Sequence, residues 1–221
     1  MLTNNESDHV LIVEKICFHY NKSKPVIEEI DMHIDRGEII GISGENGSGK
    51  STLLKLLVGL LSPKSGSIKS SGRIGYSPQD VIIFDYLTVK ENFQVFGKGM
   101  KLSNKEIQRQ SLMIMEKLRF SEYENELVKN LSGGTAQKVN FGISLLGDPD
   151  LLILDEPYQG MDYSSFLSFW DIQNKLRNEG KSIIIVSHLL EDRTKFTRNL
   201  HLMKGRLNEC VGDDCDECKG I

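Results

Sequence analysis

The sequence predicts an α/β protein whose core is a mainly parallel sheet. Two short runs, residues 150–155 and 182–187, are rich in leucine and isoleucine and show no polar alternation. That pattern is typical of strands that are covered on both faces. Residues 164–179, between the two runs, have the pattern of a helix that ends at Gly180. Parallel strands need a crossover of this kind, so the order strand, helix, strand favours a parallel core.

The N-terminal part predicts a small antiparallel β region followed by a strand, a loop and a helix. Residues 10–20 and 26–34 alternate loosely and carry many β-branched and aromatic side chains, which indicates two strands. Residues 38–43 are a short apolar run that leads into glycine-rich sequence. Residues 51–61 then show helical periodicity until a Ser-Pro pair stops it.

The middle of the chain changes character. Lysine, glutamate, glutamine, leucine and methionine dominate residues 88–146, and we expect an inserted helical subdomain there within a single domain spanning residues 1–221. Residues 104–120 have the pattern of an amphipathic helix. Its expected apolar positions are Ile107, Leu112, Met115 and Leu118.

After the last buried strand, three further segments are expected. We expect a polar helix at residues 189–198, a short strand near 200–203, and an acidic cysteine-containing tail from about 206 to 221. These segments complete the single domain and add no second core.

Composition and charge exclude several classes of protein. Of 221 residues, 39% are hydrophobic and 26% are charged, which is ordinary for a globular chain and argues against disorder or a coiled coil. A net charge of −4 gives no overall positive field, and we expect no nucleic-acid partner. The polar start of the chain does not resemble a secretion signal, and its apolar runs are too short to span a bilayer. We therefore expect a cytoplasmic protein that reaches a membrane only through a partner.

A phosphate-binding loop is the strongest functional signal. Residues 44–51, Gly-Glu-Asn-Gly-Ser-Gly-Lys-Ser, match the pattern and lie between a buried strand and the start of a helix. The glycines let backbone N–H groups converge on phosphate oxygens, Lys50 neutralises those oxygens, and the Ser51 hydroxyl can bind Mg²⁺. The nucleotide-binding residues we predict here are Gly44, Glu45, Asn46, Gly47, Ser48, Gly49, Lys50, Ser51 and Thr52.

Two carboxylates end the first buried run. Asp155 and Glu156 follow four apolar residues, and a parallel strand delivers such residues to the edge of the sheet beside the phosphate loop. There Asp155 can hold Mg²⁺ through water, and Glu156 can polarise an attacking water. Taken alone, an Asp-Glu pair at a strand end is more often part of an exposed edge or a helix cap. The phosphate loop upstream makes a role in the nucleotide site the favoured interpretation.

Residues 131–134, Leu-Ser-Gly-Gly, resemble the signature motif of the ATP-binding-cassette (ABC) family. In the family's order, Tyr20 resembles the aromatic residue that stacks on adenine, Gln79 the Q-loop glutamine, Asp162 the D-loop and His188 the switch histidine. Alone, Tyr20 and His188 would each more often be structural strand residues. The resemblance runs from about Val10 to Gly205 and implies the P-loop NTPase fold of ABC ATPases, with ATP and Mg²⁺ as cofactors.

The resemblance also implies roles and a second subunit. Glu156, His188 and Gln79 would be catalytic, and Ser51, Gln79 and Asp155 would hold the metal. Ser132 and Gly134 would contact the nucleotide of a second copy of the chain, or of a paralogous cassette, in a head-to-tail dimer. Thr135 follows the signature where the family commonly has glutamine, which puts any contact of this residue in the dimer in doubt.

The implied function is ATP hydrolysis that powers transport through a separate transmembrane permease. Residues 132–138 and 155–160 are similar to segments of bacterial exporters of peptides or drugs. Candidate residues for permease docking are Val81, Ile82, Ile83, Phe84, Tyr86 and Leu87, which could alternatively pack inside the helical subdomain. Two competing functions are a soluble ABC ATPase in translation, nucleic-acid work or assembly, and a switch that binds ATP without turnover.

Cys210, Cys215 and Cys218 form a C-x4-C-x2-C series in the acidic tail. Three thiolates can bind Zn²⁺ or an iron–sulfur cluster, but a closed structural site needs four ligands. His201 or a partner chain could provide the fourth. A flexible tail without metal is the favoured interpretation, and a redox or docking role is the remaining one.

Overall fold

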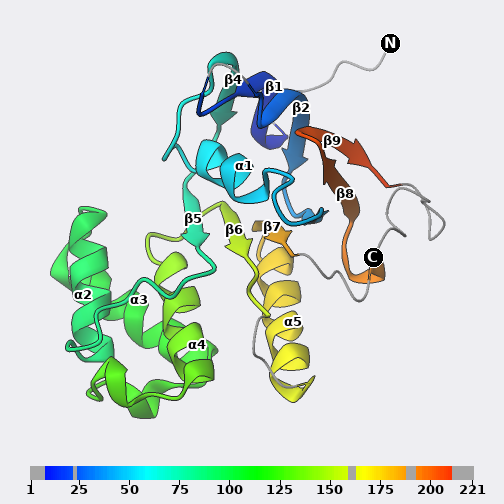
Figure 1. The fold of residues 1–221 in the computed structure, drawn as a ribbon. Helices are drawn as coiled ribbons and strands as arrows, with labels where there is room; N and C mark the ends of the chain where they lie inside the picture. The colour runs from blue at the N-terminus through cyan, green and yellow to red at the C-terminus, as the bar shows by residue number, and fades with distance from the viewer. Residues whose placement is uncertain (1–7, 22–23, 159–162, 188–192, 211–221) are drawn as a thin grey trace.

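The computed structural model describes residues 8–21, 24–158, 163–187 and 193–210, whose fold is shown in Figure 1. These residues form two sheets. The smaller sheet is antiparallel and has the order β2 (Ile27–Asp35), β1 (His9–Phe18), β4 (Ser65–Ser70). The larger sheet has the order β5 (Ile74–Ser77), β6 (Leu151–Asp155), β7 (Ser182–Val186), β3 (Ile39–Ser43), β8 (Arg198–Met203), β9 (Arg206–Glu209). Neighbouring strands of the larger sheet are parallel except β8 and β9.

The central strands of the larger sheet are buried on both faces, as their unbroken apolar sequences predict. Ile40 on β3 and Ile184 on β7 pair in register and face one hydrophobic cluster. Ile39 and Ile183 also pair, and they face a second cluster on the opposite side. Successive side chains of a strand point to opposite faces, and the buried polar residues Ser43, Asp155 and Ser182 lie only at strand ends.

The two faces of the sheet have different covers. Helix α1 (Lys50–Leu57) and the smaller sheet pack on one face and complete the first cluster with Leu53, Leu54 and residues of β1 and β2. Helix α4 (Gly133–Ser144) and helix α5 (Tyr163–Asn178) contribute Val139, Phe169 and Trp170 to the second cluster. The phosphate loop therefore leaves the sheet on the face that α1 and the smaller sheet cover. The signature segment belongs to the face that α4 and α5 cover.

Helices α2 (Val89–Gly99), α3 (Asn104–Lys117) and α4 gather to one side of the sheets (Figure 1) and lie within residues 88–146. Thr88 and Glu91 form a capping box at the start of α2, and Ser103 and Glu106 form another on α3. Short 3₁₀ helices at Ser121–Tyr123 and Val128–Asn130 connect α3 to α4. Among the described residues, no helix combines the length and apolarity required to cross a membrane.

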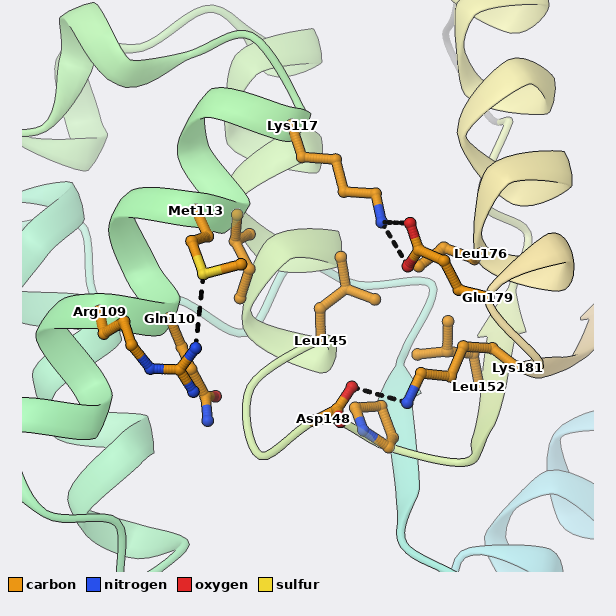
Figure 2. Close-up of a pocket in the computed structure, with 12 residues that line it drawn as sticks. Arg109, Gln110, Met113, Lys117, Leu145, Asp148, Leu152, Leu176, Glu179 and Lys181 are labelled. Atoms are coloured by element: carbon orange, nitrogen blue, oxygen red, sulfur yellow. Dashed lines mark hydrogen bonds and ion pairs between the residues drawn. The ribbon is translucent and has the colours of Figure 1, made fainter.

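A cavity of about 260 Å³ lies where α3 and the α4–β6 connection meet the C-terminal end of α5. Figure 2 shows two ion pairs at its edge. Lys117 Nζ on α3 is 2.7 Å from a carboxylate oxygen of Glu179, and Lys181 Nζ is 2.6 Å from one of Asp148. The Lys117–Glu179 pair joins the helical insert to the end of the crossover helix.

Two helices end earlier than their sequence patterns predict. Helix α3 ends at Lys117 and not at Phe120, because Arg119 has a left-handed φ of 57° that no helix interior accepts. Leu112 is 45% exposed, so it was wrongly assigned to the apolar face, which is formed by Ile107, Ile114 and Met115. Helix α1 ends at Leu57, before the Ser-Pro pair.

The segment after β7 also differs from expectation. Residues 189–192 of the expected helix at 189–198 lie outside the described residues. The remainder of that segment forms a 3₁₀ helix, Arg193–Lys195, and β8 begins at Arg198. The expected tail does not begin at 206, because Arg206–Glu209 form β9 and pair with β8. An edge strand on a polar surface has no apolar signature, which is why β9 was not predicted.

Candidate functional site

The phosphate loop joins the buried end of β3 to α1. Gly49, the residue before α1, has a φ of 108°, which only glycine adopts without strain. A Cβ on Gly44 would lie 2.4 Å from the backbone oxygen of Leu202, so the loop runs too close to β8 for any side chain there. These two glycines fix the path of the loop around the helix start.

Lys50 folds back over the loop that precedes it. Its Nζ donates to the backbone oxygens of Gly44 at 2.6 Å and Glu45 at 3.0 Å. Burial lowers the pKa of Lys50, and the nearby carboxylates of Glu156 and Asp155 oppose that shift. The lysine is therefore electrostatically linked to both carboxylates at the end of β6.

The loop fits a bound phosphate group. The Ser48 hydroxyl oxygen is buried without a hydrogen-bond partner in the described residues, and a buried hydroxyl of this kind calls for a ligand or water. The N-terminus of α1 has no side-chain cap, so its first N–H groups are available to an anion. Ser51, at the start of α1, is exposed and can present its hydroxyl to a metal ion.

Tyr20 lies beside the start of α1. Its hydroxyl is 3.2 Å from Thr52 Oγ1, and its ring packs edge-on against Phe18 with centroids 5.0 Å apart. The side chain is nevertheless 59% exposed. An exposed aromatic face next to the phosphate loop is available for stacking, and the role of Tyr20 with adenine stays a prediction.

Asp155 ends β6 and is almost fully buried. Burial, followed by the charge of Glu156, raises the pKa of Asp155 to about 6, against an ordinary value of 3.8. Lys50 acts in the opposite direction, and Asp80 adds to the rise. A bound cation would therefore stabilise the ionised form of this buried carboxylate.

Glu156 is held in an unusual conformation at the strand end. Its φ is 47°, a left-handed value that is uncommon for a residue with a side chain. Its backbone N–H donates to Val186 O at 2.8 Å, and the Ser187 hydroxyl donates to its Oε2, also at 2.8 Å. The carboxylate is thus oriented by the residue that follows β7.

The sequence did not indicate that Ser187 and Asn140 belong to the site. Asn140 on α4 donates through Nδ2 to Ser77 Oγ at 3.2 Å and to Pro78 O at 3.3 Å, which anchors the chain just before Gln79. Gln79 itself is exposed. Ser77 pairs with Leu154 in parallel register, so the Gln79 segment leaves the sheet at the same edge as the carboxylates. An asparagine within an apolar helix face was the one available signal for Asn140.

The signature segment lies at the start of α4, away from the loop of its own chain (Figure 1). Ser132 is the N-cap, accepts from Thr135 N at 3.3 Å, and has its Oγ 3.0 Å from Thr135 Oγ1. Ser132 and Gly134 are exposed. They line a groove of about 550 Å³ with Pro157 and residues of α5, and none of the described residues lining it belongs to the phosphate loop.

The apolar segment after Gln79 is largely exposed. Val81, Ile82, Phe84 and Tyr86 are 40%, 59%, 52% and 79% exposed, respectively, so they are not buried inside the helical insert, although the centroid of the Phe84 ring lies 5.9 Å from that of Phe96 on α2. Ile83 does pack against the second cluster. Asn92 accepts from Phe84 N at 2.8 Å, so this exposed segment has a defined backbone position.

Several expected site residues fall outside the described part of the chain, namely Asp162, His188, Cys215 and Cys218. His201, considered as a fourth ligand for the thiols, is buried on β8 with its Nδ1 3.0 Å from Ser43 Oγ. It contacts the strand that leads into the phosphate loop, and its proposed place beside the thiols stays a prediction.

A glycine-rich loop between β3 and α1, close to carboxylates at the end of β6, defines the class of phosphate-loop nucleotide-binding proteins. A family model described as ABC transporter matches residues 27–159. The chain is 36% identical over 188 residues to an ABC transporter ATP-binding protein of Methanocaldococcus jannaschii, covering 85% of this chain and 72% of that protein. The chain therefore belongs to the ABC transporter family, and it is an ATP-binding cassette ATPase.

Two further relatives support the same assignment. Nod factor export ATP-binding protein I of Cupriavidus pinatubonensis is 32% identical over 208 residues, which cover 89% of this chain and 64% of that protein. The solved structure of cbiO1 from Clostridium perfringens, described as part of the ABC transporter complex cbiONQ, matches with a TM-score of 0.81 at 27% identity. That match covers 91% of this chain and 87% of the other, and it confirms the predicted α/β fold.

The raised pKa of Asp155 predicts a pH-dependent penalty on folding. As pH rises from about 4 to about 6, the unfolded chain loses this proton first, so stability falls through that window and the full penalty remains above it. Asp155→Asn cannot ionise and should raise Tm by a few degrees at pH 7.5 in nucleotide-free protein. The gain should shrink by about half at pH 5. The measurement is thermal unfolding at both pH values.

Asp85→Asn is the matched control, because Asp85 is exposed. Its effect on Tm should be small and similar at both pH values. A rise in the Tm of Asp155→Asn that does not change with pH, or a fall in its Tm, would contradict the raised pKa of Asp155.

Proposed function

We propose that this chain is the ATP-hydrolysing subunit of an ABC transporter, working as a head-to-tail pair on the cytoplasmic face of a membrane, where it binds a separate permease. The observation that carries the proposal is the division of the site. Lys50, Asp155 and Glu156 meet at one edge of the sheet, whereas Ser132 and Gly134 are exposed on another part of the same chain. A second subunit would bring the two halves together.

Each described residue has a role that its position supports, whereas the role of His188, which lies outside the described residues, rests on the family resemblance. The loop amides and Lys50 bind the phosphates of ATP, and Tyr20 stacks on adenine. Ser51, Gln79 and Asp155 would hold Mg²⁺, which neutralises charge on phosphate oxygens. Glu156, oriented by Ser187, polarises the attacking water and accepts its proton, with His188 assisting.

The signature segment completes the site in the partner. The Ser132 hydroxyl and the N–H groups at the start of α4 would donate to the γ-phosphate bound by the other subunit. Both subunits then grip the same phosphate, and hydrolysis removes the group that joins them. ATP binding would close the pair and hydrolysis would open it.

Transport is supported by the exposed apolar segment at Val81–Tyr86 and by the relatives. Largely exposed apolar side chains on a backbone with a defined position form a surface suited to a membrane subunit. One relative is named for Nod factor export, and cbiO1 is described as part of a transporter complex. Export of a peptide or drug-like compound is our finer proposal, and it rests on the similarity of residues 132–138 and 155–160 to exporter segments.

Glu156→Gln should lower steady-state phosphate release by about a hundredfold or more, because the carboxylate that takes the proton is lost. ATP binding should persist, since the phosphate loop is unchanged. Glu122→Gln is the control, because Glu122 is exposed in the 3₁₀ helix that follows α3. Equal rates in Glu156→Gln and the unmodified protein would remove Glu156 from the reaction.

A shared site predicts complementation between two inactive variants. Lys50→Ala disables the loop, and Gly134→Asp places a negative charge at the signature, where a new Cβ meets nothing within 4 Å in the described residues. In an equal mixture, half of the pairs combine the two variants, and each such pair has one intact site. Phosphate release should recover to about a quarter of the unmodified rate. A mixture no more active than its components would contradict the shared site.

A tagged copy should recover a membrane partner. We expect pull-down from gently solubilised native membranes to yield a multi-span protein in stoichiometric amount, identified by mass spectrometry. A variant with Ile82, Phe84 and Tyr86 replaced by serine should lose that partner while keeping its ATPase rate. Recovery of only soluble ribosomal, nucleic-acid or assembly partners would favour a non-transport ABC ATPase.

A further inference from the structure

Three metal-ligating side chains meet on the smaller sheet, away from the phosphate loop. His9 begins β1 and pairs with Asp35 on β2, where His9 Nδ1 contacts the Asp35 carboxylate. His33 lies two residues before Asp35, so its side chain is on the same face of β2. The two imidazole centroids are 4.8 Å apart, and one ligand atom from each of the three residues lies within 4.8 Å of the others.

The backbone beneath these side chains is anchored to the larger sheet. The Ser182 hydroxyl on β7 donates to Asp35 O at 2.9 Å, and Asp35 N donates to Glu38 Oε2 at 2.8 Å. Arg198 on β8 donates through Nη1 to His33 O at 3.0 Å. Ligands on fixed strands need only side-chain rotation to close around an ion, which is the arrangement a preformed metal site requires.

The surrounding charge favours a cation. Arg36, which follows Asp35, pairs with Asp150 at 3.2 Å. Arg198 is a second nearby positive group, and its guanidinium pairs with Glu209 at 3.0 Å and lies 3.6 Å from Glu38 Oε2. These two carboxylates offset the arginine, and the Asp35 carboxylate adds a further negative charge. His33 is exposed, and His9 and Asp35 are partly exposed, so an ion can enter from solvent.

We propose that His9, His33 and Asp35 bind a Zn²⁺ ion. Two imidazole nitrogens and one carboxylate oxygen are ligands that Zn²⁺ prefers, whereas Mg²⁺ favours oxygen ligands alone. Zinc bonds of about 2.0–2.2 Å place tetrahedral ligand atoms roughly 3.3 Å apart, so the contact between His9 Nδ1 and the Asp35 carboxylate opens to admit the ion. Water takes the remaining position. The bound ion joins the start of β1 to the end of β2.

The test must separate this site from the cysteines of the C-terminal segment, which can bind zinc themselves. In the full chain with Cys210, Cys215 and Cys218 all replaced by serine, calorimetric titration with ZnCl₂ without nucleotide should show one equivalent bound. The same zinc should raise Tm by a few degrees, because the ion binds only the folded arrangement. Titration with MgCl₂ should give no such shift.

His33→Gln and Asp35→Asn in that background should each weaken zinc binding by at least about tenfold and abolish the zinc-dependent rise in Tm. His19→Gln is the matched control and should leave both unchanged, because His19 is not one of the clustered ligands. Melting without zinc shows whether each variant folds. Loss of all zinc binding in the serine background, or unchanged binding in both His33→Gln and Asp35→Asn, would leave only an ion pair between His9 and Asp35 and overturn the proposal.

Discussion

Parallel pairing of β5, β6, β7, β3 and β8 is the constraint on which the site depends. Parallel strands in register end at the same edge, and each strand that ends there delivers the next few residues to one place. The phosphate loop follows β3, the two carboxylates end β6, and Ser187 follows β7. A shift in any one register would separate groups that lie far apart in the sequence.

Burial of that sheet on both faces has a chemical result at its edge. Asp155 is the last residue of a strand in which every position is buried. Its carboxylate is therefore buried together with the apolar side chains that precede it. Burial of this strand end is the main cause of the raised pKa of Asp155, and the charge of Glu156 adds to it. The apolar core thus sets the electrostatics at this edge of the sheet.

Local sequence was sufficient where one segment determines its own structure. The unbroken apolar runs predicted the buried strands, and the glycine pattern predicted the loop of Gly44–Ser51. Contacts across the chain could not be predicted in this way, because Ser187 reaches Glu156 and Asn140 reaches Ser77 only after the sheet has formed. The contact between His9 and Asp35 could not be predicted for the same reason, because it depends on the β1–β2 register. Leu112 was misplaced because its spacing fits a helix face whose partner the sequence does not reveal.

The contact between the helical insert and the sheet has a mechanical consequence. One part of this boundary, shown in Figure 2, is a cavity edged by Lys117–Glu179 and Lys181–Asp148, pairs whose carboxylates are 54% and 77% exposed. Exposed ion pairs contribute only about 0–1 kcal/mol each, so water can replace them without leaving a buried charge. This part of the boundary is therefore held weakly, whereas the buried contacts of the second cluster hold the rest of the insert to the sheet.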